Sequence, residues 1–191
     1  MIFPRQGPVA FQPQMLRNVD SLTGAANVSR KWADWRADAC FVDSTGGFGA
    51  GWIDQLSVLG RDAVGIHFAG KALNPGRYAN KRAEMWFEMC QWIREGGILP
   101  NIPELVEELT APTYSFHKDT LLLEPKEAIK ARIGRSPDYA DALALTFAYP
   151  VAAPEASVHA RDHAREIREQ RAAYDPYAVL QRRLDPYSRL H

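Results

Sequence analysis

Asp138 and Asp141 lie three residues apart in the segment SPDYADALALTFA, residues 136–148. This segment predicts a helix with Ser136 as the N-cap and Pro137 at the first helical position, so both carboxylates fall on one face near its start. Asp138 has an ordinary alternative role, because the helix dipole favours an acidic side chain near a helix N-terminus. Asp141 heads an apolar run, and a buried carboxylate is costly unless a partner or a metal ion compensates its charge. The pair is therefore a candidate for metal binding.

A third carboxylate, Asp43, ends a predicted buried strand over 39–42 and comes directly before a glycine-rich loop. In open α/β sheets, sites are assembled beyond the carboxyl ends of the strands. Three aspartates without a surrounding Cys or His cluster suit Mg²⁺ or Mn²⁺ rather than zinc. Two such ions, about 3.5–4 Å apart, activate a water and stabilise the leaving oxygen during in-line attack on a phosphodiester. Asp43, Asp138 and Asp141 are therefore the candidate metal ligands and catalytic residues.

The glycine-rich loop over 44–51 also invites a phosphate-binding interpretation, because such loops can cradle phosphates with backbone N–H groups. The loop lacks GxxxxGK[ST], and its GFGAG run at 47–51 is one residue short of GxGxxG. Ser44 lacks the GxSxG setting of a serine nucleophile. We expect these glycines to serve tight turning and close approach of the backbone.

Basic side chains are the candidates for contacting phosphates. Four of them lie in or just after the segment AGKALNPGRYAN at 69–80, and a fifth lies in a predicted hairpin turn: Lys71, Arg77, Lys81, Arg82 and Lys118. A solvated loop is the alternative interpretation. Lys126 and Lys130, in a predicted helix over 126–133, would extend the same surface.

The elements that must position these residues follow an α/β pattern of apolar periodicity and turn signals. We expect hairpins over 2–15 and 113–124, buried strands over 39–42 and 63–68, and helices over 23–37, 52–59, 102–109 and 126–133, with a further helix ending at Gly96-Gly97. The Pro-rich stretch 150–154 marks a domain boundary. The chain thus divides into a domain over 1–150 and a tail over 151–191, where Arg and Glu alternate in an exposed helix followed by turns.

Composition restricts the class of protein. The chain has 191 residues, 46% of them hydrophobic and 24% charged, as in an ordinary globular protein. Basic residues (Lys and Arg) and acidic residues (Asp and Glu) each number 23, so the formal net charge is zero. Any attraction to nucleic acid must therefore come from a local group of basic side chains. No segment approaches the roughly 20 apolar residues that span a bilayer, and the start does not resemble a signal peptide, so we expect a cytosolic protein without membrane contact. Cys40 and Cys90 are isolated, and we expect both to be reduced core residues.

Four segments resemble, in this order, the C-terminal nuclease domain of the large terminase subunit of tailed bacteriophages: VDSTGGFGAGWID, GKALNPGRYANKRAEMW, LTAPTYSF and SPDYADALALTFA. The last segment also resembles the DxxDAL ending of Holliday-junction resolvases. The resemblance covers most of residues 1–150 and implies an RNase H-like fold, a central mixed sheet flanked by helices. It implies a metal-dependent endonuclease that cuts concatemeric phage DNA during genome packaging. By position, Asp43 corresponds to the family's second acidic residue, and Asp141, with Asp138, to the final one.

The chain also departs from the family pattern. In that family the first catalytic aspartate lies on a first strand ahead of a hairpin, whereas this chain begins at the hairpin and contains no Walker motif of the ATPase part. The resemblance therefore implies an N-terminally truncated, prophage-encoded terminase product. Two alternatives stay open: a catalytically incomplete fragment that serves as an interaction module, and a resolvase-like structure-specific nuclease.

The resemblance also implies partners and a location. The expected partners are double-stranded DNA and, through the tail, the portal or the small terminase subunit. A second copy of the chain is a further option, because pairing would protect an exposed sheet edge. The implied location is the cytoplasm of the bacterial host cell.

Overall fold

The computed structural model describes residues 1–151, so the expected tail lies, apart from Val151, outside the described residues. Helices and short strands alternate along the described chain, as the sequence predicts. In chain order they are β1 (Arg5–Gln6), β2 (Val9–Ala10), α1 (Ser21–Trp35), β3 (Phe41–Asp43), α2 (Phe48–Val58), β4 (Val64–Ile66), α3 (Lys81–Arg94), α4 (Pro103–Thr110), β5 (Tyr114–His117), β6 (Thr120–Leu123), α5 (Lys126–Ile133) and α6 (Asp138–Leu145).

The described strands form small parallel and antiparallel pairs, whereas the resemblance implies one central mixed sheet. Within residues 1–151, β1 pairs with β2 and β5 with β6 in antiparallel fashion, while β3 and β4 are parallel. Isolated bridges extend these pairs, among them Val9 to Ile98 and Tyr78 to Leu121. The strands run for only two to four residues, so each ladder ends before it can join the next.

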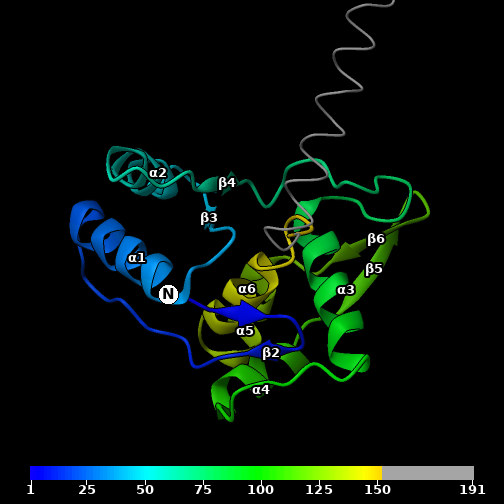
Figure 1. Cartoon of the computed structure of the whole chain (residues 1–191). Coiled ribbons are helices and arrows are strands. Elements are labelled where there is room, and N and C mark those ends of the chain that lie inside the picture. Colours follow the sequence, from blue (N-terminus) through cyan, green and yellow to red (C-terminus); the bar gives the residue numbers. More distant parts are fainter. Residues whose placement is uncertain (152–191) are drawn as a thin grey trace, which may run out of the picture. The chain divides into compact units, whose positions relative to one another are not determined.

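Helices cover both faces of the β3–β4 pair, with α1 and α2 on one side and α3 and α6 on the other (Figure 1). Successive side chains of a strand point to opposite faces. Val42 accordingly packs with Val28 and Leu56 of the α1–α2 layer, whereas Phe41 and the buried Ile66 pack with the core of α3 and α6. Asp43 follows Phe41 by two residues, so its side chain is directed to the face of α3 and α6.

Local capping fixes where α1 and α3 begin. The carboxylate of Asp20 accepts the backbone N–H of Thr23 at 2.8 Å, and α1 therefore starts at Ser21, two residues earlier than the sequence predicts. The side-chain oxygen of Asn80 accepts the N–H of Ala83 at 2.9 Å. Helix α3 consequently starts at Lys81, so two residues that the sequence analysis assigned to a basic loop lie in its first turn.

The glycine-rich loop brings α2 against the end of β3. Helix α2 starts at Phe48 rather than at the predicted Trp52, so part of this loop forms its first turn. A Cβ at Gly49 would lie 2.0 Å from the carbonyl oxygen of Asp43, which leaves room for glycine alone. The expected role of close backbone approach is therefore confirmed at Gly49.

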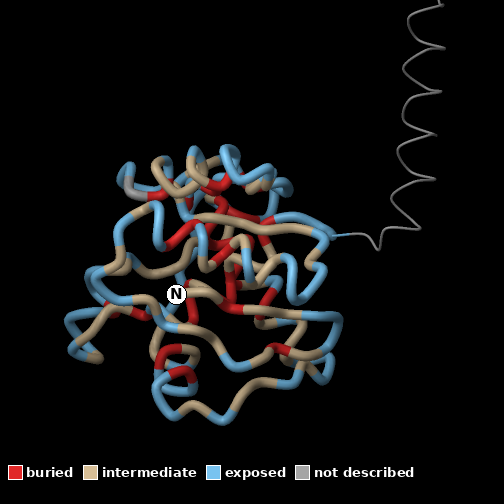
Figure 2. The backbone as a smooth tube through the Cα atoms, turned by 60° about the vertical axis from the view of Figure 1, so that its left-hand side comes forward, coloured by how far each residue is buried: buried red, intermediate tan, exposed pale blue. Residues whose placement is uncertain are grey.

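The buried segments gather in the interior of the described part of the chain (Figure 2). Both cysteines are free and partly buried, and burial raises the pKa of the Cys40 thiol to about 11. Within residues 1–151, no helix combines the length and the apolar character that crossing a bilayer requires.

Candidate metal and nucleic-acid site

The two aspartates of α6 lie in its first turn, as the sequence predicts, but in different environments. The carboxylate of Asp138 is mostly exposed, whereas Asp141 retains only 5% of its accessible surface. The helix begins at Asp138 with Pro137 at the N-cap, and no side chain of its own segment caps it. The expected Ser136 cap is therefore wrong. A carboxylate from another helix, Glu108 of α4, accepts the N–H of Ala140 instead.

Positively charged and polar side chains from two other helices surround Asp141. The indole Nε1–H of Trp86 donates to Oδ1 at 2.9 Å, and the Arg82 Nε lies 3.5 Å from the same oxygen. The Nζ of Lys126 lies 2.9 Å from Oδ2, which accepts no well-oriented hydrogen bond within the described chain, so this contact is chiefly electrostatic. The buried charge that the sequence singled out is thus compensated by Lys126 and Arg82.

Lys126 connects the two aspartates of α6. Its Nζ lies 3.6 Å from Asp138 Oδ1 in addition to its contact with Asp141. Burial, the largest effect on this amine, lowers the pKa of Lys126, but the negative charges of Asp141 and Asp138 outweigh it and raise the pKa overall. The amine therefore remains protonated and serves as the counter-ion of the pair.

Asp43 lies exposed at the carboxyl end of β3, as predicted. Its Oδ1 accepts the N–H of Thr45 at 2.8 Å, and the Thr45 hydroxyl oxygen accepts the N–H of Phe68 at 3.0 Å. These bonds tie the strand end to the segment after β4. Strand alternation directs Asp43 to the face of the β3–β4 pair on which α6, the helix of Asp138 and Asp141, packs.

The donor chemistry of these carboxylates fits a hard divalent cation, because carboxylate oxygens are the ligands that Mg²⁺ and Mn²⁺ prefer. Asp141 Oδ2 is buried and directs an unused acceptor toward Lys126. Among residues 1–151, however, no three acidic, histidine or cysteine side chains are grouped closely enough to hold an ion. Asp138 and Asp141 are brought together around Lys126, and Asp43 is not part of this group.

The basic residues divide into two sets. Lys71, Arg77 and Lys118 are exposed, as contact with phosphates requires. Lys81 is 3% exposed and its Nζ lies 2.7 Å from Glu84, while Arg82 is also buried and donates from Nη1 to the carbonyl of Glu124. The structure thus differs from the expected basic loop, because the Asn80 cap turns Lys81 and Arg82 into the protein.

Glu84 holds the loop between β4 and α3 in place. Its two carboxylate oxygens accept the backbone N–H groups of Leu73 and Asn74 at 2.9 and 2.8 Å, in addition to the Lys81 contact. Burial raises the pKa of Glu84, but these three partners outweigh it and lower the pKa overall. The loop that presents Lys71 and Arg77 is therefore anchored to α3.

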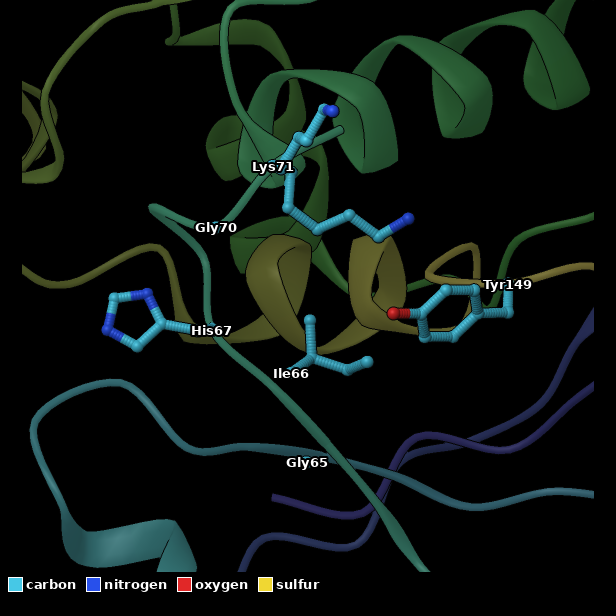
Figure 3. Close-up of a pocket in the computed structure, with 7 residues that line it drawn as sticks. Gly65, Ile66, His67, Gly70, Lys71 and Tyr149 are labelled. Atoms are coloured by element: carbon cyan, nitrogen blue, oxygen red, sulfur yellow. The ribbon is translucent and has the colours of Figure 1, made fainter. Parts of the chain in front are cut away.

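A cavity of about 230 Å³ lies beside the strand end that carries Asp43. Its lining comprises Gly65, Ile66, His67, Gly70, Lys71, Lys81 and Tyr149. Ile66 is the parallel-pair partner of Asp43. The Lys81 Nζ lies 4.5 Å from the centre of the Tyr149 ring. Figure 3 shows the Tyr149 ring on one side of the cavity, with the His67 imidazole turned to the other side of its own backbone.

Sequence reasoning missed two partners of the acidic helix, Trp86 and Glu108. Trp86 is a buried core residue, and its N–H donation to Asp141 spans 55 residues of sequence. Lys126 did carry a usable signal: it occupies the first turn of α5, where the helix dipole disfavours a cation. A lysine in that position indicates an acidic partner elsewhere in the fold.

The arrangement of helices on both faces of a short parallel strand pair, with carboxylates at a strand end and on a facing helix, defines a layered α/β fold. No family model matches the chain, and no curated protein sequence matches it. Several solved structures do match the chain. The chain is similar to the nuclease domain of the large terminase subunit gp2 of bacterial virus Sf6, at 21% identity over 78% of this chain and 81% of that one, with a TM-score of 0.63.

Two further structures of the Sf6 domain, both of a lysine-to-alanine variant, match equally well. The one with manganese has 20% identity, 78% and 82% coverage of the two chains and a TM-score of 0.64. The one with calcium has 20% identity, 78% and 81% coverage and a TM-score of 0.65. The chain therefore has the RNase H-like fold of a terminase nuclease domain, which confirms the fold class that the sequence predicted.

Proposed function

We propose that this chain is the nuclease domain of a terminase large subunit, a metal-dependent endonuclease that cuts concatemeric phage DNA during genome packaging. The proposal is supported by the acidic layer: α6, which carries Asp138 and Asp141, packs on the face of the β3–β4 pair to which strand alternation directs Asp43. The likeness to the Sf6 terminase domain, solved with manganese and with calcium, supports the same reading.

In this proposal Asp43 and Asp141 are the principal ligands of Mg²⁺ or Mn²⁺, with Asp138 as a further ligand. When bound, such ions supply an activated water and stabilise the leaving oxygen of the phosphodiester. Trp86 holds one oxygen of Asp141 through its 2.9 Å hydrogen bond and so fixes the direction of the other. Lys126 balances the charge of the aspartates and would oppose the binding of a divalent cation beside them.

Arg82 is suited to bind a phosphate beside the aspartates. Its Nη1 is held by the Glu124 carbonyl at 2.7 Å, and its Nε lies 3.5 Å from Asp141. The buried Nη2 has no hydrogen-bond partner within residues 1–151. Because a buried unpaired donor is costly, a phosphate oxygen at this point would be strongly stabilised. Arg82 thus acts from the interior of the site rather than from its surface.

Exposed Lys71, Arg77 and Lys118 would contact the DNA backbone farther from the aspartates. Lys81, whose charge is paired with Glu84, would act indirectly by anchoring the loop that presents Lys71. The chain is electrically neutral overall, so these local cations carry the attraction to DNA. Replacing one of them should reduce the salt dependence of DNA binding without changing its lack of sequence preference.

The proposal extends to partners and location. Residues 151–191 would contact the portal or the small terminase subunit in the cytoplasm of the host cell. A chain ending at residue 151 should keep its nuclease activity and lose binding to these packaging components. Equal binding by the full and the shortened chain would remove this part of the proposal.

The test of the proposed function is nicking of supercoiled plasmid in Mn²⁺ or Mg²⁺. The chain should convert plasmid to open-circular and linear forms without sequence preference, and chelation of the metal should stop the reaction. Asp43→Asn is the decisive variant, because its exposed side chain contributes one local hydrogen bond and its loss should leave the fold intact. Its activity should fall by at least about a hundredfold.

Asp54→Asn is the matched control, since Asp54 is an exposed aspartate of α2 outside the acidic layer. This variant should cut plasmid at the wild-type rate. Asp141→Asn should also be inactive, and its folding is checked by circular dichroism because the side chain is buried. Plasmid cleavage by folded Asp43→Asn at the wild-type rate would contradict the proposed role of this residue.

A further inference from the structure

We propose that Glu108 is a positioning residue: from helix α4 it fixes the first turn of α6, and with it the carboxylates of Asp138 and Asp141. Glu108 is 1% exposed, among the most buried polar side chains of the described chain. A carboxylate buried to this extent requires partners, and all of its partners belong to α6 or to the residues just before it.

The contacts of Glu108 are those of a helix cap supplied from outside the helix. Its Oε2 accepts the N–H of Ala140 at 3.0 Å, and its Oε1 lies 3.4 Å from the Arg135 Nε. The backbone of Tyr139, next to Ala140, helps to lower the pKa of the Glu108 carboxyl against the effect of burial. Tyr139 and Ala140 are the second and third residues of α6, whose N–H groups a capping side chain normally takes.

The segment before α6 cannot supply this cap. Pro137 occupies the N-cap position and has no side-chain acceptor, and within the segment the Asp138 N–H is accepted only by the backbone carbonyl of Ser136, at 2.9 Å. The free N–H groups of a buried helix start must find an acceptor. Glu108 is that acceptor, so the position of the turn depends on α4 rather than on its own sequence.

Arg135 strengthens the link between α4 and the start of α6. Besides Glu108, its guanidinium lies 2.6 Å from Glu107 Oε2 and 3.3 Å from the carbonyl of Glu104, both in α4. The residues that flank the first turn are thereby held to one face of α4. Burial of Glu108 is the largest effect on its carboxyl and raises its pKa, while the N–H groups and Arg135 oppose the shift.

Asp141 follows Ala140 directly, so a displacement of this turn moves its carboxylate away from Trp86. The bond from the Trp86 indole to Asp141 Oδ1, at 2.9 Å, therefore reports on the position of the turn. That the turn presents metal ligands rests on the proposed function, whereas the role of Glu108 in holding it does not. Residues that orient ligands typically change metal affinity by roughly 10- to 100-fold when they are replaced.

The experiment compares Glu108→Ala, Glu108→Gln and Glu107→Gln by nuclear magnetic resonance of the tryptophan indole N–H groups and by Mn²⁺ titration. The Trp86 resonance is assigned from its absence in Trp86→Phe. Trp92, whose indole donates to the Gly7 carbonyl at 3.1 Å, provides an internal reference. In Glu108→Ala we expect the Trp86 resonance to move, the Trp92 resonance to stay, and Mn²⁺ to bind roughly 10-fold more weakly.

The two glutamine variants separate positioning from general stability. Glu107→Gln weakens an ion pair to the same arginine without touching α6, so it should match the wild type in both measurements. Glu108→Gln keeps one oxygen acceptor. Its Trp86 resonance should therefore move less than in Glu108→Ala, and its Mn²⁺ affinity should fall less. If Glu108→Ala does not fold, Glu108→Gln carries the test, because its weaker acceptor should still produce an intermediate shift.

Three results are decisive. A Trp86 resonance that stays at its wild-type position in the folded Glu108 variants overturns the inference. A fall in melting temperature with unchanged Trp86 resonance and Mn²⁺ affinity also overturns it, because Glu108 would then be structural only. A wild-type chain that binds no Mn²⁺ overturns the proposed function instead, and the Trp86 resonance still decides the role of Glu108.

Discussion

Replacing Lys126 by methionine should change protein stability and metal affinity in opposite directions. The lysine amine lies 2.9 Å from Asp141 Oδ2 and 3.6 Å from Asp138 Oδ1, so it compensates both carboxylates. Methionine keeps the length and the apolar stem of the side chain and removes the charge. Asp141, which is 5% exposed, then retains Trp86 and Arg82 as its partners.

The loss of stability follows from the burial of the pair. Removing one partner of a fully buried ion pair costs roughly 3–5 kcal/mol. The side chain of Lys126 is 37% exposed, and Arg82 remains beside Asp141. The cost is therefore reduced to about 1–2 kcal/mol, which lowers the melting temperature of a chain of this size by roughly 2–8 °C.

The gain in metal affinity follows from the removed repulsion. A unit positive charge within about 4 Å of a divalent cation repels it by about 2 kcal/mol even at the dielectric constant of water. That energy corresponds to a factor of roughly 30 in the dissociation constant. Mn²⁺ should consequently bind Lys126→Met more tightly than the wild type, and saturating Mn²⁺ should recover the lost stability.

Thermal unfolding with and without Mn²⁺, together with calorimetric titration, measures both effects. Lys130→Met is the matched control, since Lys130 is an exposed lysine of the same helix and forms no ion pair within residues 1–151. It should leave both quantities unchanged. Wild-type Mn²⁺ affinity in folded Lys126→Met would refute the reasoning that the lysine and the cation share one group of carboxylates.

Three other predictions concern the loop after β3 and two buried glutamates. Gly49→Ala should lower the free energy of unfolding by at least about 2 kcal/mol, because its Cβ would lie 2.0 Å from the Asp43 carbonyl oxygen. Gly51→Ala is the control and should leave this free energy unchanged, because its Cβ would meet nothing closer than 3.7 Å. Equal denaturation curves for the two variants would contradict this prediction. The lowered pKa of Glu84 adds stability above pH 4.5 that is lost as pH falls through its folded pKa, so Glu84→Gln should be less sensitive to acid. The raised pKa of Glu108 has the opposite effect: it adds stability below pH 4.5 that is lost as pH rises through the folded pKa. Glu108→Gln should remove this loss of stability with rising pH, which urea unfolding measured across pH would show.

Local patterns in the sequence predicted most elements and the local positions of all three carboxylates, in the first turn of a helix and at the end of a strand. The apolar run after Asp141 predicts a buried helix face, and the run before Asp43 predicts a strand that ends there; the structure has both. These features depend on side chains a few residues apart, because helix and turn hydrogen bonds join near neighbours. Even the caps of α1 and α3, at Asp20 and Asn80, are local signals that a closer reading could use.

Tertiary packing alone decided what surrounds the acidic helix. Trp86 reaches Asp141 across 55 residues, and Glu108 reaches Ala140 across 32. The same packing turned Lys81 and Arg82 inward and placed Lys126 between two aspartates. No local pattern contains these pairings, since the burial of a charged group is settled by which helices cover it. The sequence thus determined which residues could do chemistry, and the fold determined which charges stand beside them.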